Sequence, residues 1–405
     1  MSSSTHGTGG TQRPVPRIAL AALVTVLAGA AACAPSSQQG GGAAAPGGAT
    51  PSAVIDDAAD FDLDALEAAA KKEGSITVYD SSGDITKVAK AFTAKYGIKA
   101  TGVKNKVGDT LEKMTREAQA DNVTIDMTLY EDGPSLVGEL LPQKVVHTWI
   151  PADLAEQIPQ GNRSPLLVLQ KANVWVYNPK LFPKGCPVDN IWDLVGPEWK
   201  GKVALQDPLG KPNIVEWFNQ MSNGADQALR DAHSAAHPGG ELKTSQKSAG
   251  QEWVVRLAKN SPVLTSADDD VAAAVASPNQ KQPRIGLVSN AKFRDVEEKN
   301  YSMKVCDTLK PWSGYLYPKY SAIATKSTHP NAAKLFTHFV LTEEGISHEM
   351  DAGGIPGSSA VKQGSFSPPG LTDWKKELFA FDPKYLAKDF ADTEAMQDLW
   401  RISHS

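Results

Sequence analysis

Polar side chains that can bind a small solute follow several apolar segments of this sequence, at the points where those segments end. The set is Ser81, Ser82, Glu131, Asp132, Asp207, Asn213, Ser289, Asn290, Lys292, Tyr315 and Tyr317. Serine hydroxyls and free backbone N–H groups at a helix start can hold a phosphate or a carboxylate. The Glu131–Asp132 pair can hold an ammonium group, and tyrosine rings can stack on a ligand or hydrogen-bond to it. The set predicts a site for a polar ligand.

Each of these residues also has a purely structural explanation. Ser81 and Ser82 can cap the helix that follows them. The acidic pair can cap a helix that begins near Ser135, and Asp207 and Asn213 flank a turn. Tyrosines in such loops serve packing as often as binding.

The chain carries only weak signatures of an enzyme. Ser289 and Lys292 match S-x-x-K, but the S-D-N element is absent and the nearest K-T-G candidate reads KTS. No G-x-S-x-G nucleophile elbow occurs. His233 and His237 have the i, i+4 spacing of metal ligands without the glutamate of H-E-x-x-H, and we interpret them as a solvated helix end. We therefore expect no catalytic residues, no bound metal and no cofactor.

Segments with strand and helix patterns alternate along the chain. The predicted strands are Ser75–Tyr79, Lys99–Val103, Ile125–Tyr130, Leu166–Tyr177, Lys202–Leu205, Arg284–Val288 and Tyr320–Ala324. The predicted helices are Phe61–Lys72, Ile85–Tyr96, Thr110–Gln119, one that starts at Ile214, one that starts at Asp268, Asn331–Leu341, and one or two within Trp374–Ile402. This alternation predicts an α/β fold with a mostly parallel sheet and helices on both faces.

The first residues have the pattern of an export signal. Arg13 and Arg17 precede the apolar run Ile18–Ala32, which is shorter than the ~20 apolar residues of a permanent membrane span. A basic start, a short apolar core and a small-residue end are typical of a secretory signal, here 1–32. The end, AAAC, resembles a bacterial lipobox that is cut before a lipid-bearing cysteine, Cys33, although the first alanine replaces the commoner leucine. A soluble secreted protein cut at an Ala-x-Ala site is the alternative.

Residues 33–54 then form a predicted flexible tether, because they are rich in glycine, serine and alanine. The formal net charge is −5, and no basic stripe interleaved with aromatic residues occurs, so we expect no nucleic-acid partner. After Cys33 only Cys186 and Cys306 remain. Because exported chains meet an oxidising compartment, we predict a Cys186–Cys306 disulfide, with two buried free thiols as the alternative.

Several longer segments resemble one known family. They are ITVYDSSG, TIDMTLYEDGPSL, ANVWVYNPKLFP with DNIWDLVGPEWKGKVALQDP, SADDDVAAAVAS with PRIGLVSNA, and SAIATKSTHPNAAKLFTHFVLTEEG. In these segments the chain resembles the solute-binding proteins of ABC importers, within the type 2 periplasmic-binding-protein group that takes ferric iron, thiamine, phosphorylated sugars and polyamines. The resemblance covers most of the mature chain.

The resemblance implies two α/β lobes joined by hinge-crossing strands, with the solute in the cleft between them. We expect the first lobe to comprise residues 55–170 and 312–405, and the second lobe residues 171–311. Open α/β sheets bind ligands at the carboxyl ends of their strands, so the polar set should line this cleft. Lobe closure would present a surface to a membrane permease, and we expect a monomer.

The ligand class follows from one departure. Ferric-binding members carry adjacent tyrosines after the strand that corresponds to Arg284–Val288, whereas this chain has SNAKF there. An iron site would need Tyr315, Tyr317 and Tyr320 as substitutes. Lys292 and the hydroxyl groups favour an anionic group, and the acidic pair favours a cationic group on the same molecule.

We therefore expect a solute-binding component of an ABC importer for an anionic or zwitterionic organic solute. It would be exported and held by lipid on the outer face of the cytoplasmic membrane, or periplasmic. The alternatives are a ferric-iron-binding protein of the same family and an exported adhesin or cell-wall interaction protein with the same fold.

Overall fold

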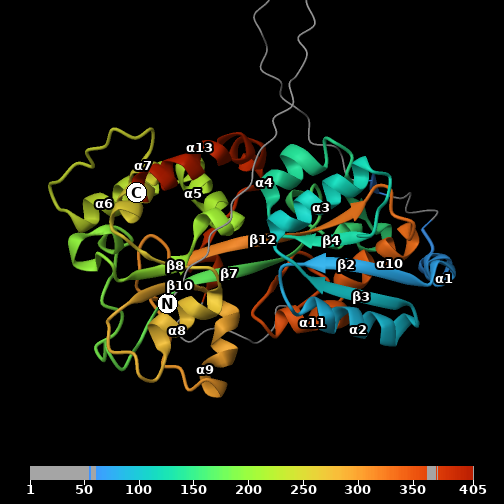
Figure 1. The fold of residues 1–405 in the computed structure, drawn as a ribbon, viewed down its shortest axis with the longest axis horizontal. Coiled ribbons are helices and arrows are strands. Elements are labelled where there is room, and N and C mark those ends of the chain that lie inside the picture. Colours follow the sequence, from blue (N-terminus) through green and yellow to red (C-terminus); the bar gives the residue numbers. More distant parts are fainter. Residues whose placement is uncertain (1–53, 56–60, 363–370, 372, 405) are drawn as a thin grey trace, which may run out of the picture. The chain divides into compact units, whose positions relative to one another are not determined.

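The chain folds around one large mixed β-sheet (Figure 1), in a computed structural model that describes residues 54–55, 61–362, 371 and 373–404. These residues belong to one unit, Ala49–Ser405. The predicted signal, Cys33 and the tether up to residue 53 lie outside the described residues. Within the described ranges, no helix is both long and apolar enough to cross a membrane.

The central strands of the large sheet lie in the order β3-β2-β4-β12-β7-β10-β8-β9, and β5, β11, β13 and β14 extend it. The strands are β1 (Val54–Ile55), β2 (Ser75–Asp80), β3 (Lys99–Lys104), β4 (Met127–Tyr130), β5 (Val146–His147), β6 (Trp149–Ile150), β7 (Leu167–Tyr177), β8 (Val203–Gln206), β9 (Val263–Thr265), β10 (Ile285–Ser289), β11 (Lys304–Val305), β12 (Gly314–Ala324), β13 (Ile355–Pro356) and β14 (Phe379–Ala380). β1 and β6 form a separate two-stranded sheet.

Two long strands, β7 and β12, join the two ends of this sheet. They pair antiparallel with each other, from Gly314↔Val174 to Tyr320↔Leu167. The last residues of β12 pair with β4, and the last residues of β7 pair with β10, both antiparallel. β3-β2-β4 and β10-β8-β9 are parallel within themselves. The expectation of a mostly parallel sheet is thus correct for each end and wrong for the crossing strands.

Helices cover both faces of each end of the sheet. They are α1 (Leu63–Glu73), α2 (Ile85–Tyr96), α3 (Val107–Gln119), α4 (Gly133–Ser135), α5 (Pro212–Gly224), α6 (Asp226–Ala236), α7 (Ala249–Lys259), α8 (Asp268–Ala276), α9 (Asp295–Glu298), α10 (Pro330–Val340), α11 (Glu343–Met350), α12 (Trp374–Glu377) and α13 (Leu386–His404). Short helical turns are η1 (Leu136–Leu140), η2 (Ala152–Gln157), η3 (Gln160–Asn162), η4 (Asp193–Val195), η5 (Pro197–Trp199), η6 (Pro208–Gly210), η7 (Asn290–Arg294) and η8 (Pro383–Tyr385).

Separate hydrophobic cores lie at the two ends. Near β3-β2-β4, α2 and α10 bring together Phe92, Phe336 and Phe339. Near β10-β8-β9, α5 and α7 pack through Trp217 and Trp253, whose rings lie 5.4 Å apart. Two cores along one sheet are the arrangement expected of two lobes.

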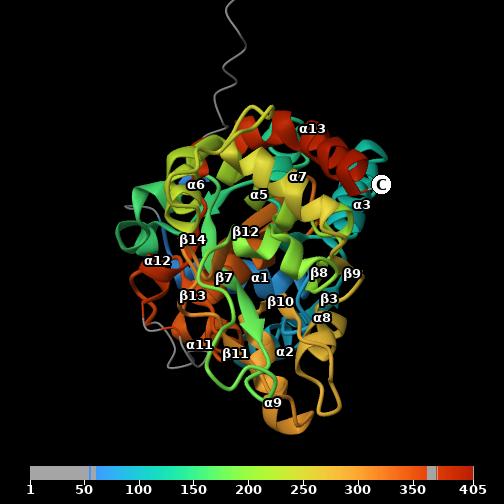
Figure 2. The same ribbon diagram turned by 90° about the vertical axis from the view of Figure 1, so that its left-hand side faces the viewer.

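The C-terminal helix α13 crosses from one end to the other. It packs against α5 and α7 and also against α4 and η1. Figures 1 and 2 both show it along the outer side of α5 and α7.

The predicted Cys186–Cys306 disulfide is confirmed. It joins the loop after β7 to the segment after β11, which itself pairs with β7. Cys306 is fully buried in the core near β10-β8-β9.

Candidate functional site

The carboxyl end of β2 opens a polar turn before α2. Asp80 Oδ1 accepts a hydrogen bond from the Ser82 N–H at 2.9 Å, and Ser82 Oγ accepts one from the Asp84 N–H at 3.2 Å. These contacts fold the predicted serine loop onto itself. Ser81 is left to approach Glu131, where its hydroxyl helps to lower the pKa of that carboxyl group.

A buried charge cluster lies beside this turn, where β2, β4, β7, β12 and α11 meet. Lys319 Nζ binds both carboxylate oxygens of Asp80 at 2.8 and 2.9 Å and donates to Glu349 at 3.2 Å. Lys171 forms an ion pair with the same Glu349. Lys319 is 0% exposed, so its charge depends on these carboxylates for compensation.

Glu131 is the member of the cluster that also contacts the other end of the sheet. Its Oε1 lies 3.5 Å from Lys319 Nζ, and its Oε2 lies 3.6 Å from Nζ of Lys211. Burial alone would raise the pKa of Glu131, but Lys211, Lys319 and Lys171 together lower it to about 2. Glu131 is therefore a fixed negative charge at neutral pH.

Lys211 belongs to the β10-β8-β9 end, directly before α5. Its ammonium lies 6.0 Å from the ring centre of Tyr317, on β12. Burial raises the pKa of Tyr317 well above 10, and the carboxylates of Glu131 and Asp268 add to that rise. Tyr317 thus lies as a neutral phenol among charges from both ends of the sheet.

The first turn of α5 carries an amide with an unused donor. Asn213 Oδ1 accepts a hydrogen bond from Tyr315 Oη at 3.2 Å, and Tyr315 Oη accepts one from Asn173 at 2.6 Å. Asn213 Nδ2 is buried and has no hydrogen-bond partner in the described part of the chain. The Tyr315 ring stacks on those of Trp217 and Phe381, so the hydroxyl group that donates to Asn213 Oδ1 is fixed in place.

Two further contacts link the ends. Arg294 of η7 lies 3.4 Å from Asp84, at the start of α2. Burial would raise the pKa of Asp84, but Lys87 and Arg294 lower it to about 2. The side chain of Asn290 donates to the Gly353 carbonyl at 2.9 Å.

The structure brings together part of the predicted set. Ser81, Glu131, Asn213, Tyr315 and Tyr317 lie around Lys211 and the charge cluster, as their shared contacts and electrostatic interactions indicate.

The remaining residues of the set have local structural partners. Asp132 caps α4 through the Ser135 N–H, and Asp207 accepts from the Leu209 N–H at the start of η6. Ser289 accepts from the Ala291 N–H at the start of η7. Lys292 pairs with Asp269 at 3.1 Å and with Asp295 at 3.6 Å. The ammonium of Lys292 is thus not free to serve the S-x-x-K chemistry considered above.

Sequence reasoning missed most of the charged residues at this place. They are Asp80, Lys171, Lys211, Asp268, Lys319 and Glu349. A signal was present for two of them, since Lys171 and Lys319 interrupt the otherwise largely apolar strands LVLQKANVWVY and GYLYPKYSAIA. A lysine in a strand buried on both faces requires a buried carboxylate.

The interpretation of His233 as part of a solvated helix end needs correction. His233 is 6% exposed and packs edge-on against Trp192, so it is not solvated. His329 lies between Ser75, whose Oγ is 3.3 Å from Nε2, and Asp126, whose Oδ1 is 3.0 Å from Nδ1. Asp126 also accepts from Thr77 N–H and Ser327, so this network ties β2 to the start of α10.

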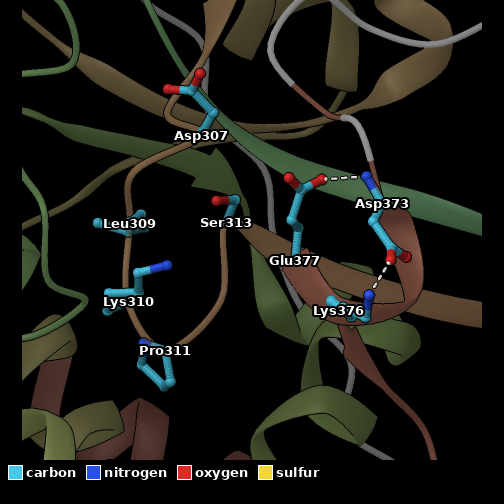
Figure 3. Close-up of a pocket in the computed structure, with 8 residues that line it drawn as sticks. All are labelled: Asp307, Leu309, Lys310, Pro311, Ser313, Asp373, Lys376 and Glu377. Atoms are coloured by element: carbon cyan, nitrogen blue, oxygen red, sulfur yellow. Dashed lines mark hydrogen bonds and ion pairs between the residues drawn. The ribbon is translucent and has the colours of Figure 1, made fainter.

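A pocket of about 330 Å³ lies elsewhere, between the segment that precedes β12 and α12 (Figure 3). Its walls are Asp307, Leu309, Lys310, Pro311, Ser313, Asp373, Lys376 and Glu377. Lys376 forms an ion pair with Asp373. The Asp373 backbone N–H donates a hydrogen bond to the Glu377 carboxylate. None of the predicted ligand residues lines this pocket.

Comparison with known proteins identifies the class. The sequence profile of the bacterial extracellular solute-binding protein family matches residues 76–353. No curated protein matches the chain. The chain belongs to the family of bacterial extracellular solute-binding proteins, which act with ABC importers.

Solved structures agree on the fold. Iron-bound HitA from Pseudomonas aeruginosa is 20% identical, with a TM-score of 0.63 over 82% of this chain and 99% of that chain. AfuA from Actinobacillus pleuropneumoniae, with fructose-6-phosphate bound, is 17% identical, with a TM-score of 0.61 over 82% of this chain and 98% of that chain. The ferric binding protein from Campylobacter jejuni is 15% identical, with a TM-score of 0.58 over 80% and 99%. The fold is thus the two-lobed type 2 periplasmic binding protein fold.

Proposed function

We propose that the protein captures a small polar organic solute with both a cationic and an anionic group, and delivers it to an ABC permease. The solute binds between a first lobe, 55–170 plus 312–405, and a second lobe, 171–311. Its ammonium group binds Glu131 of the first lobe. Its carboxylate, phosphate or phosphonate binds at the start of α5 in the second lobe, beside Lys211 and Asn213.

The observation that carries this proposal is the Lys211–Glu131 pair, whose Nζ–Oε2 distance is 3.6 Å. It joins opposite charges from the two lobes, at a distance too long for a good hydrogen bond. Glu131 Oε2 and Asn213 Nδ2 are both buried, and neither has a hydrogen-bond partner among the described residues. A solute with both charges would satisfy these two groups while it replaces the direct pair.

The dipole of α5 supports the anionic half of this assignment. Thirteen residues, Pro212–Gly224, form the helix. Its first residue is a proline without an N–H, and the Ile214 N–H donates to the Lys211 carbonyl at 2.9 Å. The anionic half therefore depends on the positive end of the helix dipole, the charge of Lys211 and the free Asn213 Nδ2 donor. Capture then shifts an open–closed equilibrium, because only the closed form makes both contacts.

A thermal-shift screen of the purified mature chain tests the proposal. The panel contains amino acids, amine-bearing phosphonates, sugar phosphates, thiamine, polyamines and ferric salts. We expect the largest rise in melting temperature with a zwitterionic compound. Glu131→Gln should weaken binding about 10-fold or more, because it removes the ion pair to the ammonium group.

Asp207→Asn is the matched control for that variant, because Asp207 is bound within its own turn. It should leave the affinity within about twofold. If no zwitterion raises the melting temperature, or if both variants bind equally well, the proposal is wrong.

The same thermal-shift screen also tests two alternative functions, ferric-iron binding and adhesion. Ferric binding would rest on Tyr315, Tyr317 and Tyr320, yet burial raises the pKa of all three phenols well above 10, and Lys211 adds a positive charge near Tyr317. These features disfavour a trivalent cation, although a shift with ferric salts alone would reverse that judgement. An adhesin role would gain if no solute stabilises the chain.

The cellular placement is part of the same proposal. We infer that the chain is exported and lipidated at Cys33, and that it acts as a monomer beside its permease. This inference is supported by the signal and lipobox pattern of 1–33 and by the family of extracellular proteins to which the chain belongs.

A further inference from the structure

The buried carboxyl group of Glu216 lies where α5 meets the start of α4. Glu216 is 2% exposed, and neither carboxyl oxygen has a well-formed hydrogen bond within the described ranges. Its Oε1 lies 3.1 Å from the place that a Cβ on Gly133 would occupy, so the carboxyl group touches the backbone of α4. An ionised carboxylate is strongly disfavoured in such a place, because nothing replaces its lost hydration.

The charged groups that face Glu216 make ionisation of its carboxyl group still less favourable. Burial raises the pKa of Glu216 well above its usual value, and the carboxylates of Asp132, before α4, and Asp389, on α13, raise it further. The Gly133 N–H lowers it without offsetting these effects. From β12, the phenols of Tyr315 and Tyr320 interact with it, and burial raises the pKa of both well above 10, so both are neutral. No cation is among the groups that shift this pKa in the part of the chain that the structure describes.

Glu216 also lies at a contact that opening would separate. α5 belongs to the proposed second lobe and α4 to the first, while α13 packs against both. In the open form water would reach the carboxyl group and restore its ordinary acidity. In the closed form the carboxyl group stays protonated.

We propose that lobe closure loads a proton onto Glu216, so that the closed form is favoured by acid and disfavoured by alkali. The proposal rests on the proposed function, because it needs lobes that open and close. It makes the solute-binding equilibrium dependent on external pH through a residue that does not contact the solute.

The sign of the effect follows from proton linkage. Below about pH 4.3, the ordinary value for a glutamate, both forms hold the proton and pH has no effect through this group. Above that pH the open form loses the proton and the closed form keeps it. The open-to-closed ratio then rises by up to tenfold per pH unit, until the closed form also ionises.

Small-angle X-ray scattering of the solute-free mature chain between pH 4.5 and 8.5 tests the proposal. We expect the radius of gyration of the wild type to increase with pH, because open molecules accumulate. Glu216→Gln keeps a neutral side chain of the same shape, and it should stay compact at high pH. Glu216→Met serves the same purpose if the glutamine variant does not fold.

Glu198→Gln is the matched control, since Glu198 is exposed on the same lobe, and it should behave as the wild type. A radius that does not change with pH in the wild type overturns the proposal. So does a change that Glu216→Gln leaves intact. Either result is separate from the solute screen, which judges the proposed function by itself.

Discussion

At the scale of single residues, the site depends on two lysines placed inside buried strands. Lys171 and Lys319 carry charge where water cannot reach, so each is kept by carboxylates from other elements. Together with Lys211, they lower the pKa of the buried Glu131 and keep it an anion where the two ends of the sheet meet. Asp80 shows the cost: burial raises its pKa to about 6, although Lys319 opposes the rise.

Lys319→Met tests this dependence on charge. Removing one partner leaves Asp80 and Glu349 as buried acids with only Lys171 nearby, which should lower the free energy of unfolding by about 3–5 kcal/mol at pH 7.5. The loss should shrink at pH 5, because Asp80 can then take up a proton. Urea unfolding followed by circular dichroism measures both values.

Lys95→Met is the control, because the Lys95–Glu344 pair is exposed. Surface pairs contribute about 0–1 kcal/mol. If Lys319→Met costs no more than Lys95→Met, the cluster is not the ionised network described above.

For Asp268 we predict that removing the charge raises the free energy of unfolding, whereas removing the charge of Lys319 lowers it. Burial raises its pKa to about 6, with Lys292 opposing the rise, so the folded state loses stability through this group as pH rises from about 4 to about 6. Asp268→Asn removes the titration. It should match the wild type near pH 4.5 and exceed it by on the order of 2 kcal/mol at pH 7.5.

Asp269→Asn is the neighbouring control. Hydrogen bonds from Lys299 lower the pKa of Asp269, so this variant should be slightly less stable than the wild type at pH 7.5. A stability gain in both variants would mean that the gain has nothing to do with burial of Asp268.

At the scale of elements, many strands and helices were predictable, but α7, α11 and β9 were not, and only part of the candidate site was. Segments such as SITVYD and NAAKLFTHFV reveal their elements through local periodicity, and Tyr320–Ala324 was recognised as a strand. Its first residues, Gly314–Lys319, were missed because a proline and a lysine lie there. Only the paired strands and α11 show that the lysine is buried and bound.

Contacts between residues that are far apart in the sequence also explain why individual site residues were not predicted. Lys319 meets Asp80 across 239 positions and Glu349 across 30, and no local pattern encodes such contacts. Glu131 and Asp132 are equivalent by sequence, yet one is turned towards the other lobe and the other caps a helix. The disulfide was predictable because only two cysteines were available to it.

That disulfide gives the prediction at this scale. It closes a loop of 120 residues across the proposed second lobe. In the chain-entropy model, a loop of this length is worth on the order of 4–5 kcal/mol. The double variant Cys186→Ala with Cys306→Ala should therefore unfold at a clearly lower urea concentration, by the same amount as the chemically reduced wild type. Equal midpoints for the oxidised and reduced wild type would contradict it.

At the scale of the whole molecule, the two lobes must touch in the closed form and still be able to separate. Three polar contacts join the β3-β2-β4 end to the β10-β8-β9 end: Lys211 with Glu131, Arg294 with Asp84, and Asn290 with the Gly353 backbone. The C-terminal helix adds apolar contacts, because α13 packs against α5 and α7 as well as against α4 and η1, with the Phe218 and Trp400 rings 5.7 Å apart. Partly exposed polar pairs contribute little each. β7 and β12 hold the lobes together covalently, so weak contacts suffice, and a solute of modest affinity can decide between the two forms.

The proposed lipidation of Cys33 would set where this equilibrium operates. About twenty residues of low complexity lie between Cys33 and the first described strand in the sequence. Cys33→Ala should move the protein from the membrane fraction to the soluble exported fraction, while the melting temperature and the solute-induced shift stay unchanged. Cell fractionation with immunoblotting, and incorporation of a labelled fatty acid, measure the change. Wild-type protein that is already soluble and unlabelled would show that the signal is cut at the Ala-x-Ala site instead, and that capture takes place without an anchor.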